Sequence, residues 1–271
     1  MKPHITTAPG RIDLHVAGER FTSYELQNAA PGFTVLHATG LRPVTQPDAG
    51  AGLCLWLIHG NVNGMSFGVG DPEDPTTGRI VTRDLVVRRG SQSVGFLHEC
   101  DWVDGDAKVL LHEARTVRVA NAPSSGALLD LDVVLQASAD GPLDLGITES
   151  SLVCCRVAPS LMPSGGGQLR NSSDDFGPQD LHGRPASWVA CTGVVQGETV
   201  GMAFLEHPDN PWYPSPWIVQ EDGRLSPSPF AWRSQTLPAG RSLALRYRIL
   251  VQTGYVEAGW IRARMVDWLR E

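Results

Sequence analysis

A chain of 271 residues with 42% hydrophobic residues and a formal net charge of −7 is long and apolar enough to fold as one large globular domain. Its net negative charge argues against binding to nucleic acid or to an anionic membrane, because binding to either requires a basic protein surface. No run approaches the ~18 apolar residues of a membrane span, the N-terminus lacks an apolar signal segment, and the five cysteines form no CxxC pair. We therefore predict a single cytoplasmic domain, residues 1–271, with reduced thiols.

The first distinctive stretch is CLWLIHGNVNGMSFG, residues 54–68. Its apolar residues alternate along a predicted strand that ends at His59, and a Gly/Asn turn containing Asn61 and Asn63 follows. An imidazole has a pKa near neutrality, so a histidine presented at a strand end can act as a general acid or base. The alternative is that His59 bonds the turn backbone and only fixes the loop.

Alternation of apolar and polar residues continues through five segments, which are 79–88, 94–103, 107–119, 127–136 and 242–251. Such alternation predicts half-buried strands. In the first segment it places Val81, Leu85 and Val87 on one face. Frequent turn signals between the segments indicate an antiparallel sandwich or barrel.

The second and third of these segments form a predicted hairpin. If its turn is Gly105-Asp106, two pairs face each other across the ladder, His98 with Glu113 and Glu99 with His112. Imidazole and carboxylate are ordinary zinc or iron ligands, so the hairpin is a candidate metal site. If the register differs by one residue, these side chains no longer face each other. In addition, cross-strand His–Glu pairs are usually surface hydrogen bonds. We therefore predict no bound metal.

Glu149 precedes a predicted buried strand within GITESSLVCCRVA and is a candidate carboxylate base. Arg156 lies seven residues further on, so a regular strand would put the two side chains on opposite faces. A bend in the strand is required for the two to cooperate.

Residues 204–218, FLEHPDNPWYPSPWI, carry prolines at short intervals. Proline fixes φ and removes a backbone donor, so the segment is predicted to be a stiff loop rather than a helix or a central strand. It contains His207, Asn210, Trp212 and Trp217, and rigid loops on a scaffold often carry binding residues. The alternative is that the tryptophans only cap a hydrophobic core.

Residues 256–270 depart from the strand pattern, because Ala258, Ile261, Met265 and Trp268 recur at helical spacing. This spacing predicts a C-terminal amphipathic helix that packs on a sheet. Together with the predicted strands, it makes the expected fold class an all-β antiparallel sandwich with one C-terminal helix.

Seven stretches of the chain, in order and with similar spacing, carry a resemblance to a known family. They are LWLIHGNVNG (55–64), GRIVTRD (78–84), ECDWVDGDAKVLLHEART (99–116), DLGITESSLVCCRVAPSL (144–161), GRPASWVACTG (183–193), GMAFLEHPDNPWYPSPW (201–217) and LPAGRSLALRYRILVQTG (237–254). The chain resembles the bacterial PmoA family, a methane oxygenase PmoA-like domain of unknown function. Relatives typically carry His-His-Arg-Gly before the Leu-Trp pair, where this chain has Ala51-Gly52-Leu53-Cys54, so it resembles a divergent member.

The resemblance implies a fold and a broad kind of activity. Proteins of that family often accompany sugar-oxidising dehydrogenases, and their architecture resembles the galactose-mutarotase β-supersandwich, in which a sugar lies on a concave antiparallel sheet. Methane oxygenation is not expected of this chain, which has no membrane span and no copper-like ligand cluster.

The leading hypothesis is an enzyme that performs metal-independent acid/base chemistry on a sugar, a glycoside or another oxygen-rich cyclic substrate. It would isomerise, eliminate or hydrolyse, with His59 and His207 transferring protons and Glu149 as their carboxylate partner. The residues expected to bind the substrate are Asn61, Asn63, Arg156 and Asn210, through hydrogen bonds, and Trp102, Trp188, Trp212 and Trp217, as aromatic walls. This hypothesis requires that His59 and His207 converge in space. Since GxGxxG, P-loop, GxSxG and HExxH motifs are absent, we expect no cofactor.

Two alternatives stay open. A cyclase or isomerase of a bacterial secondary-metabolite pathway would use the same pocket for a larger and more apolar substrate. A non-catalytic carbohydrate-binding protein would keep the scaffold without turnover. Ligands that bind only the native state raise the melting temperature, so a panel of sugars and apolar polycycles separates the substrate classes. The oligomeric state is left open by the sequence.

Overall fold

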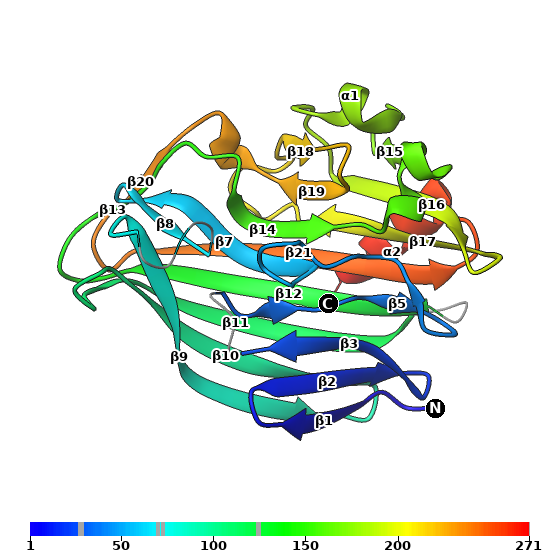
Figure 1. The fold of residues 1–271 in the computed structure, drawn as a ribbon, viewed down its shortest axis with the longest axis horizontal. Helices are drawn as coiled ribbons and strands as arrows, with labels where there is room; N and C mark the ends of the chain where they lie inside the picture. The colour runs from blue at the N-terminus through cyan, green and yellow to red at the C-terminus, as the bar shows by residue number, and fades with distance from the viewer. Residues whose placement is uncertain (27–29, 69–70, 72–73, 123–125, 271) are drawn as a thin grey trace.

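The structure, a computed structural model, describes residues 1–26, 30–68, 71, 74–122 and 126–270. Two β-sheets pack face to face in it (Figure 1). One of them, here called the long-strand sheet, is antiparallel throughout. Its strands follow one another in space as β9 (Thr77–Arg89), β10 (Ser93–Val103), β11 (Val109–Ala122), β12 (Gly126–Ala137), β21 (Ser242–Thr253), β17 (Glu198–Glu206), β16 (Trp188–Val195) and β15 (Gln168–Asn171).

The other sheet, here called the short-strand sheet, is built mostly from shorter segments. Its strands follow one another as β1 (His4–Ala8), β2 (Arg11–Val16), β3 (Glu19–Glu25), β4 (Gly32–Phe33), β7 (Leu55–Val62), β14 (Ser151–Arg156), β19 (Arg224–Pro227) and β18 (Trp217–Val219). Beside the end of β7 lie β13 (Leu143–Leu145) and β20 (Gln235–Leu237), whereas β5 (His37–Ala38) and β6 (Arg42–Pro43) pair separately. The sheets join where β8 (Met65–Phe67) runs parallel to the start of β9.

Alternating apolar residues create the core between the two sheets. In β12, Leu129, Leu131, Val133 and Leu135 are all at most 3% exposed, and they face the interior together with the matching residues of β21. Burial of apolar side chains at ~25 cal/mol per Å² is the main force that holds such layers together. The predicted all-β antiparallel sandwich is therefore confirmed.

A β-bulge in β9, where Arg83 is the extra residue, changes the face of one predicted core residue. The β9–β10 register shifts between Glu99 and Cys100. Leu85 and Val87 consequently face the core, whereas Val81 lies on the outer face and is 44% exposed. A bulge inserts one extra residue and so reverses the alternation beyond it. The expectation that Val81 shares a face with Leu85 and Val87 was wrong for this reason.

The β10–β11 hairpin also has a register different from the one expected for a Gly105-Asp106 turn. His98 is paired with Arg115, and Asp101 is paired with His112, because the connecting loop is longer than a two-residue turn and the register shifts at a bulge beside it, between Trp102 and Val103. The loop closes where the Asp104 amide donates to the Lys108 carbonyl at 3.0 Å. The pairs proposed as metal ligands are therefore not formed.

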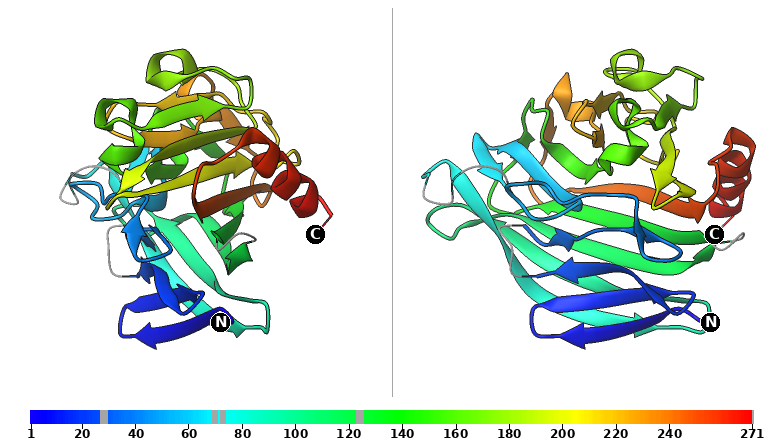
Figure 2. Two further views of the ribbon diagram at one scale, coloured as in Figure 1. Left: turned by 90° about the vertical axis from the view of Figure 1, so that its right-hand side faces the viewer. Right: turned by 45° about the vertical axis from the view of Figure 1, so that its right-hand side comes forward.

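The C-terminal helix α2 (Ala258–Trp268) packs on the outer face of the long-strand sheet, on the side away from β1–β3 (Figure 2). Ile261 and Trp268 are buried there against Trp188 and Leu205. The predicted helix and its apolar spacing are confirmed. The other helical segments are short and lie in the connections: η1 (Pro159–Leu161), η2 (Pro163–Gly165), α1 (Gly177–Leu181) and η3 (Pro229–Ala231).

The five cysteines are buried and unpaired. Burial raises the pKa of four of them, Cys54, Cys100, Cys154 and Cys191, and raises that of Cys155 well above its usual range. None of the helices in the described residues is long and apolar enough to cross a membrane.

Candidate functional site

The outer face of the long-strand sheet carries two rows of polar side chains that run across its strands. Strand register sets Arg118 opposite Asp130, and Asp130 opposite Arg248. One step along the same strands, Asp132 lies opposite Arg246. Residues directly opposite each other on one face have neighbouring Cβ atoms, so charges of opposite sign meet along each row.

The first row is rigid and largely buried. Arg248 donates from Nε to Asp130 Oδ1 at 2.5 Å and from Nη2 to Oδ2 at 3.0 Å. Arg118 adds a bond from Nε to Asp130 Oδ2 at 2.9 Å. Asp130 is 4% and Arg248 2% exposed. A carboxylate held side-on by a guanidinium is geometrically fixed, so this row forms a firm floor.

The second row is more open. Arg246 Nε donates to Asp132 Oδ1 at 3.2 Å, and the side chains of Arg246 and Asp132 are 34% and 45% exposed. The row continues into His207, whose amide donates to the Arg246 carbonyl at 3.1 Å and whose Nε2 lies 3.1 Å from Arg246 Nη1. A carboxylate, a guanidinium and an imidazole therefore adjoin one another.

The His207 ring has two competing contacts. Burial, together with the Arg246 charge, lowers the pKa of His207, so the ring is neutral at neutral pH. The Asp209 amide donates to Nδ1 at 3.1 Å, whereas a bond from Arg246 needs the lone pair on Nε2. A neutral imidazole has only one acceptor nitrogen. The proton can therefore sit on either nitrogen, which is a useful property in a group that transfers protons.

Buried groups hold His207 in this place. Asn210 Oδ1 accepts the Arg246 amide at 2.7 Å, and Asn210 Nδ2 donates to the Arg246 carbonyl at 3.1 Å. Glu206 accepts the Ser215 amide and hydroxyl, both at 2.7 Å, and so ties the two ends of the proline-rich loop together. The ring of Trp268 in α2 lies edge-to-face on His207 at 4.7 Å.

A groove of about 610 Å³ lies over these rows. The residues that line it are Gln92, Arg118, Asp130, Asp132, Arg246 and Trp268. The lining is rich in donors and acceptors and poor in apolar surface, which suits a ligand with several hydroxyl or carbonyl oxygens. We name it the outer groove.

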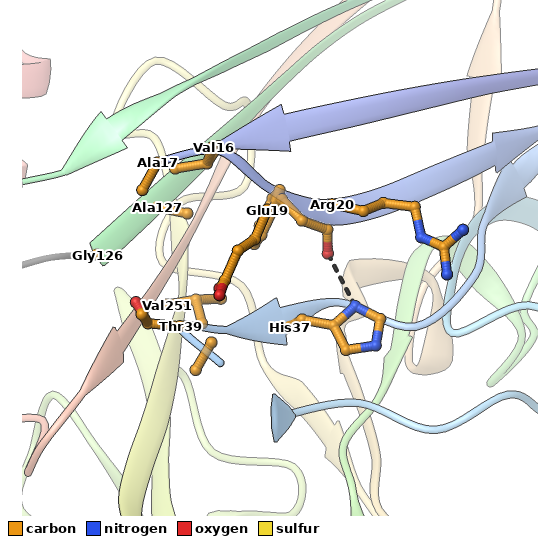
Figure 3. Close-up of a pocket in the computed structure, with 11 residues that line it drawn as sticks. Val16, Ala17, Glu19, Arg20, His37, Thr39, Gly126, Ala127 and Val251 are labelled. Carbon is orange, nitrogen blue, oxygen red and sulfur yellow. Dashed lines mark hydrogen bonds between the residues drawn. The ribbon is translucent and has the colours of Figure 1, made fainter. Parts of the chain in front are cut away.

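A second cavity is too small to hold a substrate. It lies between the β2–β3 turn, β5 and the ends of β12 and β21, and Figure 3 shows Glu19, Arg20 and His37 at its wall. His37 donates from Nδ1 to the Phe21 carbonyl at 3.2 Å. The cavity volume is about 20 Å³, which is room for one water molecule.

The structure places the two predicted proton-transfer histidines on different sheets. His59 lies in β7 of the short-strand sheet, completely buried, with its ring 5.1 Å from that of Phe230. His207 follows β17 of the long-strand sheet and packs on Trp268. No contact among the described residues joins the two imidazoles, so the arrangement that the hypothesis required is not seen.

The other predicted polar residues serve the structure where they lie. Glu149 is exposed, and Arg156 is held by Asp48 and Asp222 at 2.5 and 2.6 Å. Asn61 Oδ1 accepts the Gly64 amide at 3.2 Å, and Asn63 Oδ1 accepts the Asp144 amide at 2.7 Å. These bonds fix the loops near β7. The alternative gave that task to His59, but neither nitrogen of its ring has a hydrogen-bond partner.

Three of the predicted aromatic walls are buried. Trp102 and Trp217 are 0% exposed and donate from Nε1 to Glu113 and to the Ala186 carbonyl, both at 2.8 Å. Trp188 is 3% exposed beneath α2. Trp212 is half-buried, and its ring contacts Phe230 at 4.9 Å. Only Trp212 of the four thus offers partly accessible surface.

The hairpin histidines take part in hydrogen bonds. His112 Nδ1 lies 2.6 Å from Asp101 Oδ1 on the outer face. His98 is buried in the core, where burial lowers its pKa to about 3. Its ring lies between the Tyr24 hydroxyl, 2.8 Å from Nδ1, and the Thr82 hydroxyl, 2.9 Å from Nε2. The described residues contain no group of three or more His, Cys, Asp and Glu side chains placed to bind a metal.

The hydrogen-bond donors around His98 determine which of its ring nitrogens carries the proton. Arg115 Nη1 donates to the Tyr24 hydroxyl oxygen at 2.7 Å, so the hydroxyl proton is left to donate to His98 Nδ1. The neutral ring then carries its proton on Nε2 and donates to Thr82. Arg115 in turn donates to Glu113 at 2.7 Å, and both are buried. We name these five residues the core polar network.

Sequence reasoning missed most of the outer groove. Asp132 and Arg246 are polar residues within two of the predicted strands, 127–136 and 242–251. The available signal was complementary charge at equal spacing, Asp-Leu-Asp at 130–132 and Arg-Tyr-Arg at 246–248. Such a match indicates that two strands are neighbours in one sheet.

These observations define the class of the protein, a two-sheet antiparallel β-sandwich with a polar groove on the outer face of one sheet. The chain belongs to a family whose description is "Family of unknown function (DUF6807)", and the family model matches residues 11–265. A comparison with curated proteins finds no match. The matched model is not that of the PmoA family, so the assignment based on seven short stretches was wrong; all seven lie within the residues matched here.

Proposed function

We propose that the protein binds a sugar or a related oxygen-rich cyclic molecule in the outer groove and performs acid/base chemistry on it. The observation that carries this proposal is the combination, in a groove of about 610 Å³, of exposed parts of Asp132 and Arg246. His207 adjoins them at 3.1 Å from Arg246. Carboxylate, guanidinium and imidazole together can accept protons, donate protons and bind hydroxyl groups.

Each group has a distinct role in this proposal. Neutral His207 takes a proton from a substrate hydroxyl and later returns it. Asp132 is the carboxylate partner that binds a second hydroxyl group. Arg246 and Arg118 donate to ring or carbonyl oxygens, with Arg246 also orienting His207. His207 keeps the proton-transfer role that the sequence-based hypothesis gave to it and to His59, because it contacts Arg246 of the groove lining. The carboxylate role of Glu149 passes to Asp132, which lines the groove.

The test is a ligand screen followed by turnover. Sugars, glycosides and apolar polycycles are added to the wild-type protein, and thermal unfolding is followed, because a ligand of the native state raises the melting temperature. Asp132→Asn is expected to remove stabilisation by the sugar that stabilises the wild type. The matched control is Asp101→Asn, a carboxylate on the same outer face that pairs with His112 away from the groove lining. Equal loss in both variants, or no sugar effect at all, contradicts the proposal.

Turnover of the stabilising ligand separates catalysis from binding. His207→Gln is expected to lower kcat by about 10²–10⁴, the usual contribution of a positioned acid or base. Stabilisation of the wild type without any turnover would instead support the non-catalytic carbohydrate-binding alternative. Stabilisation by apolar polycycles alone would support the cyclase alternative.

The pH profile of kcat/KM gives a further check. Burial and Arg246 hold the pKa of His207 below its ordinary value of 6.5. The neutral, proton-accepting ring is therefore present above that lowered pKa and is lost as pH falls through it. We expect kcat/KM to stay level from pH 8 down to about 6.5 and to decline only below, with the decline absent from the residual activity of His207→Gln.

We also propose a reducing, cytoplasmic location. Its support is the set of five unpaired thiols, since oxidising compartments favour disulfides.

A further inference from the structure

His59 is a buried imidazole whose nitrogens lack hydrogen-bond partners. The residue is 0% exposed, and neither Nδ1 nor Nε2 has a partner within hydrogen-bond geometry. Burial lowers the pKa of His59 to about 4, although the nearby backbone of Gly146 and Asn61 acts in the opposite direction. Nearly all buried polar groups in native proteins are bonded, so an unpartnered pair of nitrogens marks a place where a ligand or another conformation supplies the bond.

Aromatic rings form the environment of this imidazole. The Phe230 ring meets His59 edge-to-face at 5.1 Å, and the Trp212 ring meets Phe230 at 4.9 Å. Trp212 comes from the proline-rich loop and is half-buried. The three rings form a column that leads from the buried imidazole to a partly accessible tryptophan. Phe230 occupies the middle of the column.

The backbone around His59 is shaped to carry Phe230. A Cβ atom on Gly60 would lie 2.5 Å from the Thr148 hydroxyl oxygen, so only glycine allows Thr148 to approach this closely. The Thr148 amide donates to the Phe230 carbonyl at 2.9 Å. The His-Gly motif of β7 thus fixes the contact through which η3 places Phe230 over the imidazole.

The segment that carries Phe230 is short and is followed by an exposed stretch. η3 consists of three residues, and the chain after it, from Trp232 to Thr236, is exposed at each position. Trp232 itself is 48% exposed. Phe230 itself is 0% exposed, so its displacement depends on opening of the exposed stretch that follows it, and such stretches are the usual sites of local opening.

We propose that Phe230 is a gate and that a small hydroxylated aromatic ring, such as a phenol, takes its place between Trp212 and His59. The hydroxyl group of the ligand bonds to a His59 nitrogen that has no partner in the closed form, and the ring of the ligand keeps the two aromatic contacts. This site lies on the short-strand sheet and is independent of the outer groove.

The chemistry of the walls selects the ligand class. Two aromatic neighbours and one polar group favour a flat ring with one hydroxyl group over a polyol, whose further hydroxyl groups would lose their bonds to water. The neutral imidazole offers one donor and one acceptor and no charge, so a phenolic hydroxyl is a better match than a carboxylate. The polar groove and this aromatic site therefore select different molecules.

The test compares phenol with toluene, which has nearly the same shape and no hydroxyl group. Binding of each to the wild-type protein is measured by ligand-observed NMR titration. We expect phenol to bind about fivefold more tightly than toluene, as one net hydrogen bond provides. In His59→Phe, which keeps an aromatic ring without polar atoms, this preference is expected to vanish while toluene binding remains.

Two further variants separate the gate from general surface binding. Phe230→Leu removes the ring from the column and is expected to strengthen phenol binding, whereas Trp232→Ala changes an exposed neighbour and is expected to leave it unaltered. The proposal is overturned if phenol does not bind the wild type, or if its preference over toluene persists in His59→Phe. The wild-type and His59→Phe comparison decides the matter even if Phe230→Leu does not fold.

Discussion

Glu99 and Glu113 lie on opposite faces of the same hairpin, and their surroundings make their expected contributions to stability very different. Glu113 is 2% exposed and accepts bonds from Arg115 Nε at 2.7 Å and from Trp102 Nε1 at 2.8 Å. Glu99 is on the outer face and is only partly buried. Breaking a buried ion pair by removing one partner leaves a charge without compensation, which is far more unfavourable than losing a surface carboxylate.

Glu113→Gln is therefore expected to lower the free energy of unfolding by about 3–5 kcal/mol. Glu99→Gln, the matched control on the neighbouring strand, is expected to change it by less than about 0.5 kcal/mol. Urea denaturation of both variants and the wild type measures the difference. Similar small effects for the two variants would show that the core polar network adds nothing to stability.

Two buried histidines predict how stability changes with acid. The pKa of His98 is about 3 and that of His59 about 4 in the fold, against 6.5 for an ordinary imidazole. Both are depressed, so the unfolded chain binds protons that the folded chain does not. The stabilisation is complete above pH 6.5 and is lost as pH falls toward 4, by about 1.4 kcal/mol per pH unit for each histidine.

Urea denaturation at pH 7, 5.5 and 4.5 measures this slope. His98→Gln keeps an acceptor for Tyr24 and a donor for Thr82 while removing the titrating group, so it is expected to remove about half of the slope. An unchanged slope in this variant would assign the acid sensitivity to other groups.

At the scale of elements, α2 links the sandwich to the outer groove. Trp268 is 2% exposed, with the Arg248 guanidinium over its face at 4.9 Å and the His207 ring against it at 4.7 Å. The same ring packs with Trp188 and Leu205 of the sheet. The helix thus supports stability and the position of His207 through one side chain.

Trp268→Ala is expected to lower the free energy of unfolding by about 3–5 kcal/mol, as deletion of a large buried ring does. It is also expected to weaken binding of any ligand of the outer groove, because His207 and Arg246 lose the surface on which they rest. Leu269→Ala, next along the chain and 51% exposed, is the control and is expected to change neither quantity. Thermal unfolding with and without ligand measures both.

The sequence allowed the strands and the terminal helix to be predicted, but not the pairing of side chains between strands. Alternation identified β12 and β21 because one face of each is apolar. It failed at Val81, where the bulge beside Glu99 depends on the neighbouring strand and has no local pattern. The outer groove was missed for a related reason. Asp132 and Arg246 are 114 residues apart, and only strand order brings them together.

At the scale of the whole molecule, one core unites both sheets. Its buried residues come from the first strand, with Ile5, to the last, with Val251, and from both layers. A protein whose main core draws on both sheets is expected to unfold in one cooperative step. We therefore expect unfolding curves from tryptophan fluorescence and from far-UV circular dichroism to coincide. Two separated transitions would indicate two independently folding units and contradict a single domain.

The five buried thiols give this molecule a built-in set of chemical reporters. A thiol-specific reagent reacts with thiolate, and these groups are both inaccessible and held largely protonated by burial. Each thiol is therefore labelled only when the structure around it opens. Cys100 lies beside the core polar network, Cys191 lies in β16, and Cys54 precedes β7, so their individual labelling rates resolve which layer opens first. No engineered probe is needed to follow the motions of this sandwich.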